Sequence, residues 1–314
     1  MEIKINFTDF WPDFDKKDNY FYNLLVQKYT VVIDENPDLL FFSSFGKDYL
    51  KYKCKRIHYT GENFRPNFYL SDFVFSFDYL SRKNHFRLPL YSLYIERHKG
   101  YKNFWLNKNE ETLKNIWAKK NKFCCMVVSN PKAKDRIKFF ENLSKFRQID
   151  SGGAVLNNVG GRVKNKMEFI NDYKFVIAFE NASFDGYTTE KILEPILMDC
   201  IPIYWGNKKI DLEFNTKRFI NFHDFESEEE LFKRLEEIES NPDLALEILK
   251  EPIFAKDRID YETEKTLVLE HIINVIESNK KPIAQTYWPD VYKLKKKYYL
   301  FRERLKNRLK RHVH

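Results

Sequence analysis

Short apolar runs that alternate with polar helical stretches constrain the fold of this 314-residue chain more than any other feature. In the second half, the run KFVIAF is followed by the helical pattern TTEKILEPILMD and then by a further apolar run, IPIYWG. Continuous runs of Val, Ile and Phe are typical of strands buried on both faces of a parallel sheet, whose strands are joined by crossover helices. We therefore predict an α/β fold with doubly wound sheets.

The chain is long enough for two such sheets, each with its own core. In the first half, the runs EIKINF, TVVIDE, DLLFFSSF, KRIHYTG and DFVFSF predict strands, and in the second half the alternation resumes from KFCCMVV onward. The pattern weakens over residues 91–121, which we interpret as an inter-domain region. The simplest architecture is two Rossmann-like domains that face each other across a cleft, with ligands at the carboxyl ends of the strands. The predicted parts are domains over residues 1–118 and 119–270, a helix over residues 271–292 and a tail over residues 293–314.

The net charge of +8 is concentrated in the tail. Between Lys293 and His314 there are ten Lys and Arg residues and one acid, Glu303, so the tail carries +9 and the rest of the chain −1. Apolar residues recur there every three or four positions, as a cationic amphipathic helix requires. We expect this tail to bind an anionic membrane surface; a solvated helix and nucleic-acid binding are the alternatives. The apolar positions are Leu294, Tyr298, Phe301, Leu305 and Leu309.

The stretch FENASFDGYTTEK, residues 179–191, leads from the KFVIAF strand into the next helix. Gly186 permits a tight turn or a close approach of the backbone to a ligand, and Thr188 can cap the helix. The amides of the first helical turn and the ammonium of Lys191 favour an anion. The carboxylate of Glu190 would repel phosphate but suits sugar hydroxyls, so a nucleotide-sugar would use both groups. A capped helix with a surface ion pair is the alternative.

Two further stretches each follow a predicted strand. SNPKAKDR opens a helix and places Arg136 on its early part, where a guanidinium can form two hydrogen bonds to a phosphate. A solvated basic helix face is the alternative. HYTGEN places Glu62 behind a glycine at the carboxyl end of a strand, where a carboxylate could act as a general base; an ordinary turn residue is the alternative.

Several other kinds of site have no support. The sequence contains no GxxxxGK[ST], no GxGxxG, no HExxH, no GxSxG and no cluster of histidines. We expect neither a signal peptide nor a membrane-spanning helix, since no window approaches about 20 apolar residues. The cysteines form no CxxC pair, and we expect thiols in a reducing compartment instead of disulfides or zinc. These cysteines are Cys54, Cys124, Cys125 and Cys200.

Together these stretches resemble the alpha-1,3-fucosyltransferases of glycosyltransferase family 10. The signature FENS-x(2)-GY-x-TEK is matched by FENASFDGYTTEK, with one extra residue before the glycine, and its continuation by ILEPILMDCIPIYWGN. SNPKAKDR, GGAVLNNVGG, NKMEFINDYKF and FINFHDF match further segments, and YTGENFRPNF and FSFD resemble the bacterial members. The resemblance covers roughly residues 56–225.

The resemblance implies the GT-B architecture, with an acceptor-binding N-terminal domain and a GDP-fucose-binding C-terminal domain. It implies an inverting enzyme that moves L-fucose from GDP-fucose to a hydroxyl of an N-acetyllactosamine-type glycan. The expected linkage is alpha-1,3, with a Lewis x-like product, and bacterial members act on lipopolysaccharide. The inserted residue, Asp185, changes the loop over the donor.

The residue roles of the family carry over onto matching positions of this sequence. Glu62 matches the general base of the family. Because cations and a helix N-terminus can stabilise a leaving diphosphate, we expect no obligatory metal or other cofactor. The positions that match the donor-binding residues are Arg136, Asn181, Tyr187, Glu190 and Lys191.

We therefore expect GDP-fucose and a glycan acceptor as partners, and no nucleic acid. The expected location is the cytoplasm, at the inner face of the cytoplasmic membrane. The alternatives are a transferase for another nucleotide-sugar, a nucleic-acid binder that uses the tail, and a non-catalytic glycan-binding module. The acceptor, alpha-1,3 against alpha-1,4 linkage, the oligomeric state and the sugar that Glu190 contacts, ribose or fucose, remain open.

Overall fold

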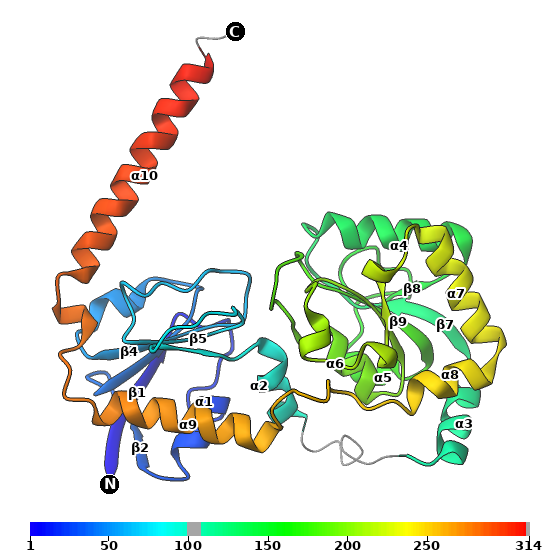
Figure 1. Ribbon diagram of the computed structural model, residues 1–314, viewed down its shortest axis with the longest axis horizontal. Coiled ribbons are helices and arrows are strands. Elements are labelled where there is room, and N and C mark those ends of the chain that lie inside the picture. Colours follow the sequence, from blue (N-terminus) through cyan, green and yellow to red (C-terminus); the bar gives the residue numbers. More distant parts are fainter. Residues whose placement is uncertain (99–107, 312–314) are drawn as a thin grey trace. The chain divides into compact units, whose positions relative to one another are not determined.

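The protein folds into two compact units, each built on one parallel sheet (Figure 1). The computed structural model describes residues 1–98 and 108–311, with side chains up to residue 303. The sheets and their crossover helices confirm the predicted α/β class with two doubly wound parallel sheets. The first unit contains Met1–Ser76, Leu80–Leu88 and Asp260–His314, and the second contains Phe77–Tyr79 and Pro89–Ile259.

The compact units divide at other places than the predicted boundaries after residues 118 and 270. Residues 91–121, where the apolar pattern weakens, include most of α2 (Leu90–Arg97) and all of α3 (Glu110–Lys119), and both helices belong to the second unit. Helix α3 packs against α8 (Pro242–Leu249), and its Trp117 is buried in the core of that unit. The assignment of the acceptor to one domain and the donor to the other stays a prediction.

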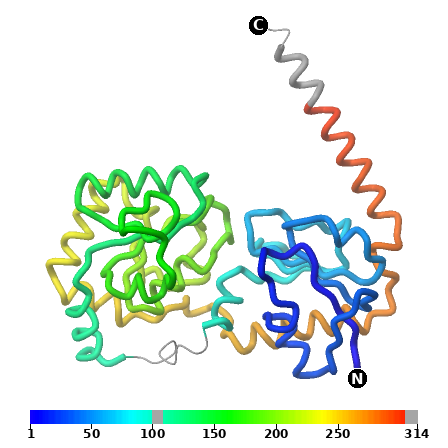
Figure 2. The backbone as a smooth tube through the Cα atoms, turned by 180° about the vertical axis from the view of Figure 1, so that it is seen from behind, coloured from blue at the N-terminus to red at the C-terminus, as the bar shows by residue number. Residues whose placement is uncertain are grey.

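The first unit has a six-stranded sheet in the order β2-β1-β3-β4-β5-β6, with every pair parallel. All five apolar runs of the first half form strands. The short strand β6 was not predicted, because its residues form no apolar run. Figure 2 shows α9 (orange) running beside the blue strands of this unit. The strands are β1 Glu2–Thr8, β2 Thr30–Ile33, β3 Leu39–Phe42, β4 Lys55–Thr60, β5 Phe73–Ser76 and β6 His85–Arg87, and the helices are α1 Tyr20–Leu25, α9 Tyr261–Glu277 and α10 Trp288–Arg311.

The second unit has a five-stranded sheet in the order β11-β10-β9-β7-β8, again with every pair parallel. The chain runs from β7 outward to β8, then returns to β9 and continues outward on the other side. The strand order therefore reverses between β7 and β9, which is the place where open α/β sheets bind ligands. The strands are β7 Lys122–Met126, β8 Asp150–Ser151, β9 Tyr173–Phe179, β10 Ile201–Trp205 and β11 Ile220–Asn221, and the remaining helices are α4 Lys134–Phe146, α5 Lys166–Ile170, α6 Glu190–Leu197 and α7 Glu228–Ser240.

Helices cover both faces of this second sheet. Alternate residues of β9, namely Phe175, Ile177 and Phe179, join one core with apolar side chains of α3, α4, α7 and α8. Because successive side chains of a strand point to opposite faces, Val176 and Ala178 face the other layer, where α6 packs on β9 and β10. Strand β9 is thus buried on both sides, as its continuous apolar sequence predicts.

Candidate functional site

The segment between β9 and α6 turns tightly at Gly186, whose backbone has φ of +83°. A Cβ atom at this position would lie 2.3 Å from the carbonyl oxygen of Phe77, so only glycine fits. The predicted cap at Thr188 is wrong: Thr189 has the extended N-cap conformation, and its side chain accepts from the amide of Lys191. Thr188 instead accepts a hydrogen bond from Asn207.

Asn207, which follows β10 and is completely buried, holds this segment in place. Its Oδ1 accepts hydrogen bonds from the amides of Gly186 at 2.8 Å and Lys209 at 2.9 Å. Its Nδ2 donates to Thr188 Oγ1 at 3.1 Å and to the buried Glu213 at 2.9 Å. The Asn207 side chain thus holds the turn at Gly186 and at Thr188, and ties it to the backbone that follows β10. Asn207 is not among the site residues predicted from the sequence, although it directly follows the IPIYWG run.

Arg136 bridges the switch point of the second sheet. It lies on the first turn of α4, after β7, and is only 1% exposed. Its guanidinium donates to the carbonyl oxygen of Phe179, the last residue of β9, and to Asn181 Oδ1 at 2.9 Å. Burial lowers the pKa of Arg136, whereas the carboxylate of Glu180 opposes that shift. The structure therefore brings Arg136 and Asn181 together, as the predicted site requires.

Lys191 lies on the first turn of α6 and is mostly buried, with 17% of its side chain exposed. Its Nζ lies 2.9 Å from Thr189 Oγ1, 3.2 Å from Glu180 Oε2 and 3.6 Å from Glu190 Oε1. Burial lowers the pKa of Lys191, but the two carboxylates more than offset it, so the pKa lies above its ordinary value. Lys191 therefore stays protonated at the N-terminus of α6, where the helix dipole also favours an anion.

The two remaining predicted site residues are Tyr187, in the second unit, and Glu62, in the first. Tyr187 is 1% exposed, and its ring packs 5.1 Å from that of Phe77 in the second unit. Glu62 belongs to the first unit, in the loop after β4. Its carbonyl oxygen accepts from Thr60 Oγ1 at 3.0 Å and from the amide of Phe64. The roles of Tyr187 and Glu62 stay predictions.

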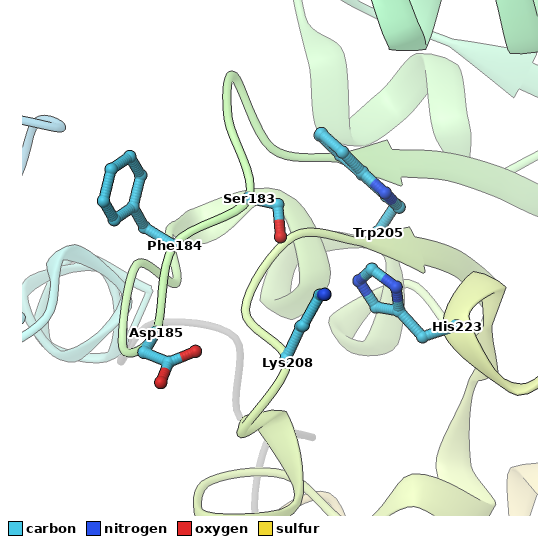
Figure 3. Close-up of a pocket in the computed structure, with 6 residues that line it drawn as sticks. All are labelled: Ser183, Phe184, Asp185, Trp205, Lys208 and His223. Carbon is cyan, nitrogen blue, oxygen red and sulfur yellow. The ribbon is translucent and has the colours of Figure 1, made fainter.

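A pocket of about 710 Å³ opens at the carboxyl ends of β9, β10 and β11, beside the same segment. Ser183, Lys208 and His223 point toward one another there, whereas Phe184 points away (Figure 3). The indole of Trp205 lies 6.3 Å from the His223 ring. Burial lowers the pKa of His223, which is therefore largely neutral at neutral pH. The lining residues are Ser183, Phe184, Asp185, Trp205, Lys208 and His223, none of which sequence reasoning marked as a site residue.

The part of the chain that the structure describes contains neither a cluster of metal ligands nor a membrane-spanning helix. Within those residues, no group of three or more His, Cys, Asp or Glu side chains is arranged to hold a metal ion. No helix among them combines the length and the hydropathy needed to cross a membrane.

Fold and site define a class of protein. Two doubly wound parallel units, with two cations, an amide and a helix N-terminus at the switch point of the second, are features of the GT-B type of glycosyltransferase. Comparison with known proteins agrees with this class. Residues 5–94 match the model of the alpha-(1,3)-fucosyltransferase FucT N-terminal domain, and residues 117–250 match that of the glycosyltransferase family 10 (fucosyltransferase) C-terminal region.

The alpha-(1,3)-fucosyltransferase FucT of Helicobacter pylori is 33% identical over 79% of this chain. This chain spans 60% of that relative's length. The mouse 4-galactosyl-N-acetylglucosaminide 3-alpha-L-fucosyltransferase 9 is 33% identical over 40% of this chain and 36% of its own.

Solved structures of an alpha1,3-fucosyltransferase are also similar. Its complex with GDP is 30% identical with a TM-score of 0.74, covering 89% of this chain and 92% of that one. Its complex with GDP-fucose is 29% identical with a TM-score of 0.73, covering 89% and 91%. This chain belongs to glycosyltransferase family 10, the fucosyltransferases.

Proposed function

We propose that this chain is an inverting alpha-1,3-fucosyltransferase that moves L-fucose from GDP-fucose to a hydroxyl of an N-acetyllactosamine-type glycan. The observation that carries the proposal is the meeting of Arg136, Asn181 and Lys191 at the switch point of the second unit. The similar solved structures with GDP and GDP-fucose support the choice of donor.

The second unit offers the diphosphate of the donor two kinds of stabilisation. Arg136 and Lys191 each supply a full positive charge, and the first turn of α6 supplies backbone amides. Negative charge grows on the diphosphate as the bond to fucose breaks, so donors that are already in place lower the barrier. Because these groups can balance the charge of the leaving GDP, we propose that no divalent metal is obligatory.

The chemistry needs one base and one leaving group. In the proposed reaction, the carboxylate of Glu62 takes the proton of the acceptor hydroxyl as its oxygen attacks the anomeric carbon of fucose. The bond between that carbon and the GDP oxygen breaks, and GDP departs from the opposite face, so the anomeric configuration inverts. Glu190, 18% exposed beside Lys191, would accept hydrogen bonds from hydroxyls of ribose or fucose.

The proposed function also includes a membrane surface that the tail binds and a glycan acceptor at that surface. Within the described side chains of α10, Leu294, Tyr298 and Phe301 are more than half exposed and lie at helical spacing. Leu305 and Leu309, which continue the pattern, lie outside the described side chains. We propose that residues 293–314 bind the anionic inner face of the cytoplasmic membrane, where a lipopolysaccharide precursor would be the acceptor.

A transfer assay tests the proposed function. The full chain is incubated with GDP-fucose and with lactose, type 1 N-acetyllactosamine or type 2 N-acetyllactosamine, and NMR of the product gives the linkage and the anomeric configuration. We expect an alpha-1,3-linked product on the type 2 acceptor, at an undiminished rate in EDTA. UDP-glucose replaces GDP-fucose in a parallel reaction. Transfer from UDP-glucose alone, or no transfer from GDP-fucose, would refute the proposed donor.

A further inference from the structure

Glu180 is a completely buried carboxylate directly behind the proposed phosphate-binding lysine. Its Oε1 accepts from the amide of Thr189 at 2.7 Å, and the Thr189 hydroxyl lies 2.8 Å from its Oε2. The same Oε2 lies 3.2 Å from Lys191 Nζ. A buried carboxylate is costly unless it is paired and hydrogen-bonded, and these contacts satisfy both oxygens. The carboxylate therefore ties the end of β9 to the cap of α6.

The sheet leaves room for this side chain. Phe179 points into the α4 and α7 core, so Glu180 points to the opposite layer, where α6 begins. The Glu180 amide donates to the carbonyl oxygen of Trp205 at 2.8 Å, which continues the pairing of β9 with β10. Next to it lies Gly206, where a Cβ atom would be only 2.6 Å from Glu180 Cγ. The absence of a side chain at Gly206 leaves the space that the Glu180 side chain occupies.

The three polar contacts of the Lys191 ammonium differ in length and in exposure to solvent. An ammonium has three N–H donors, and here two of them are directed at Thr189 Oγ1 and Glu180, which lie within 2.9 and 3.2 Å of Nζ. The third neighbour, Glu190 Oε1, lies at 3.6 Å and belongs to a side chain that is 18% exposed. A ligand oxygen can replace the longer, more exposed contact, whereas the two buried contacts can persist when it binds.

We propose that Glu180 is a positioning residue for donor binding: its carboxylate, with Thr189, anchors the ammonium of Lys191 so that its remaining N–H is aimed at the diphosphate. This inference rests on the proposed function, in which Lys191 binds that diphosphate. A lysine side chain is flexible, and fixing it beforehand lowers the cost of ordering it on binding. Glu180 itself touches no substrate.

A double-mutant cycle on GDP binding tests this role. Glu180→Gln keeps the shape and the acceptor for the Thr189 amide but removes the charge that holds Lys191. We expect it to weaken GDP binding, measured by calorimetry, about tenfold in the wild-type background and less than about twofold in Lys191→Ala, because the lost interaction is shared. An equal loss in both backgrounds would overturn the inference.

Glu194 provides the matched control. It is also a buried carboxylate, on α6, but it pairs with Lys166 and His98 and lies outside the proposed site. Glu194→Gln is expected to lower the melting temperature and to leave GDP affinity unchanged. If Glu180→Gln does not fold, Glu180→Asp, which keeps the charge on a shorter stem, is measured in the same two backgrounds with the same criterion.

The pH dependence of GDP binding separates positioning from simple structural support. The charged groups that face Lys191 are Glu180, Glu190 and Arg136. Without the Glu180 charge, burial and Arg136 are opposed only by Glu190, so the Lys191 pKa falls below its wild-type value. As the pH rises, Lys191 in Glu180→Gln therefore loses its proton earlier, and GDP affinity should decline at a lower pH than in the wild type. A loss of affinity by the same factor at every pH would contradict the inference.

The two proposals fail in different ways. A wild-type chain that binds no GDP would refute the proposed function and the role of Glu180 with it. A wild-type chain that binds GDP and transfers fucose, but shows additive effects of the Glu180 and Lys191 substitutions, would refute only the role of Glu180.

Discussion

Arg136 and Lys191 carry the positive charge at the switch point of the second unit. Arg136 is held by a hydrogen bond to Asn181, and Lys191 by an ion pair with Glu180. Their positions follow from the sequence, because each lies in the first turn of a helix that follows a predicted strand. The partners do not follow from it. Glu180 is one acid at the end of an apolar run, and only the folded chain shows that Thr189 and the space beside Gly206 surround it.

Removal of either cation should abolish most of the transfer. We expect Lys191→Ala and Arg136→Ala each to lower kcat/KM for GDP-fucose by about two to three orders of magnitude, as loss of a preorganised donor does. Lys174→Ala is the control, since this lysine lies on β9 but pairs with Glu239. Circular dichroism and the transfer assay give the measurements. Near-normal kinetics in either variant would remove that residue from the site.

Glu62→Gln should separate binding from chemistry. The substitution keeps the backbone contacts that hold the loop, because Thr60 and Phe64 donate to the Glu62 carbonyl oxygen and not to its side chain. We expect GDP-fucose affinity within about twofold of the wild type and transfer reduced by about 10²-fold or more, since a general base is lost. Calorimetry and the transfer assay are run on the same preparation, and lost donor binding would point to another role.

The segment between β9 and α6 is held in place by its backbone conformation as well as by charged side chains. Gly186 has a positive φ and touches the Phe77 backbone, while Asn207 fixes the segment from β10. The requirement for a glycine was predictable from the strand-to-helix turn. The shift of the cap from Thr188 to Thr189 was not, because the hydroxyls of adjacent threonines are equivalent until the fold supplies Asn207 for one and Glu180 for the other.

Gly186→Ala should destabilise the second unit more than an equivalent change elsewhere. Gly160 is the matched control: its φ is +82°, close to the +83° of Gly186, but no atom lies within 4 Å of an added Cβ. We expect Gly160→Ala to cost about 1 kcal/mol from backbone strain alone, and Gly186→Ala clearly more because of the Phe77 contact. Chemical denaturation gives both values. Equal costs would show that the segment moves aside freely.

At the scale of the whole molecule, the chain returns from the second unit to the first at Asp260. Helix α9 packs on the first unit, where the Lys55 ammonium donates to the Val275 and Ile276 carbonyl oxygens. The base of α10 is anchored there too, with Lys295 Nζ 2.7 Å from the Tyr69 hydroxyl. Because the chain is back in the first unit from Asp260 onward, the boundary after residue 270 falls inside α9 of that unit.

Deletion of residues 293–314 should release the chain from anionic vesicles and leave catalysis on a soluble acceptor intact. The reason is that this segment carries the +9 charge, while the rest of the chain is close to neutral. Co-sedimentation with vesicles containing phosphatidylglycerol, with neutral vesicles for comparison, measures the effect. A second variant that replaces Leu294, Tyr298 and Phe301 by Ser keeps the charge and tests the apolar face. Binding that survives the deletion would refute the membrane proposal.

Most of the strands and helices, the parallel class of both sheets and the two cations at helix starts of the second unit were predictable from the sequence, whereas the short strands β6 and β8 were not. Those features follow from local patterns, namely apolar runs, helix starts and glycine turns, which act over short stretches of chain. The pairing of Glu180 with Lys191, the bridge from Arg136 to β9 and the membership of α3 and α9 could be decided only by the folded chain. Each depends on residues far apart in sequence that meet only when a sheet brings its strand ends to one edge.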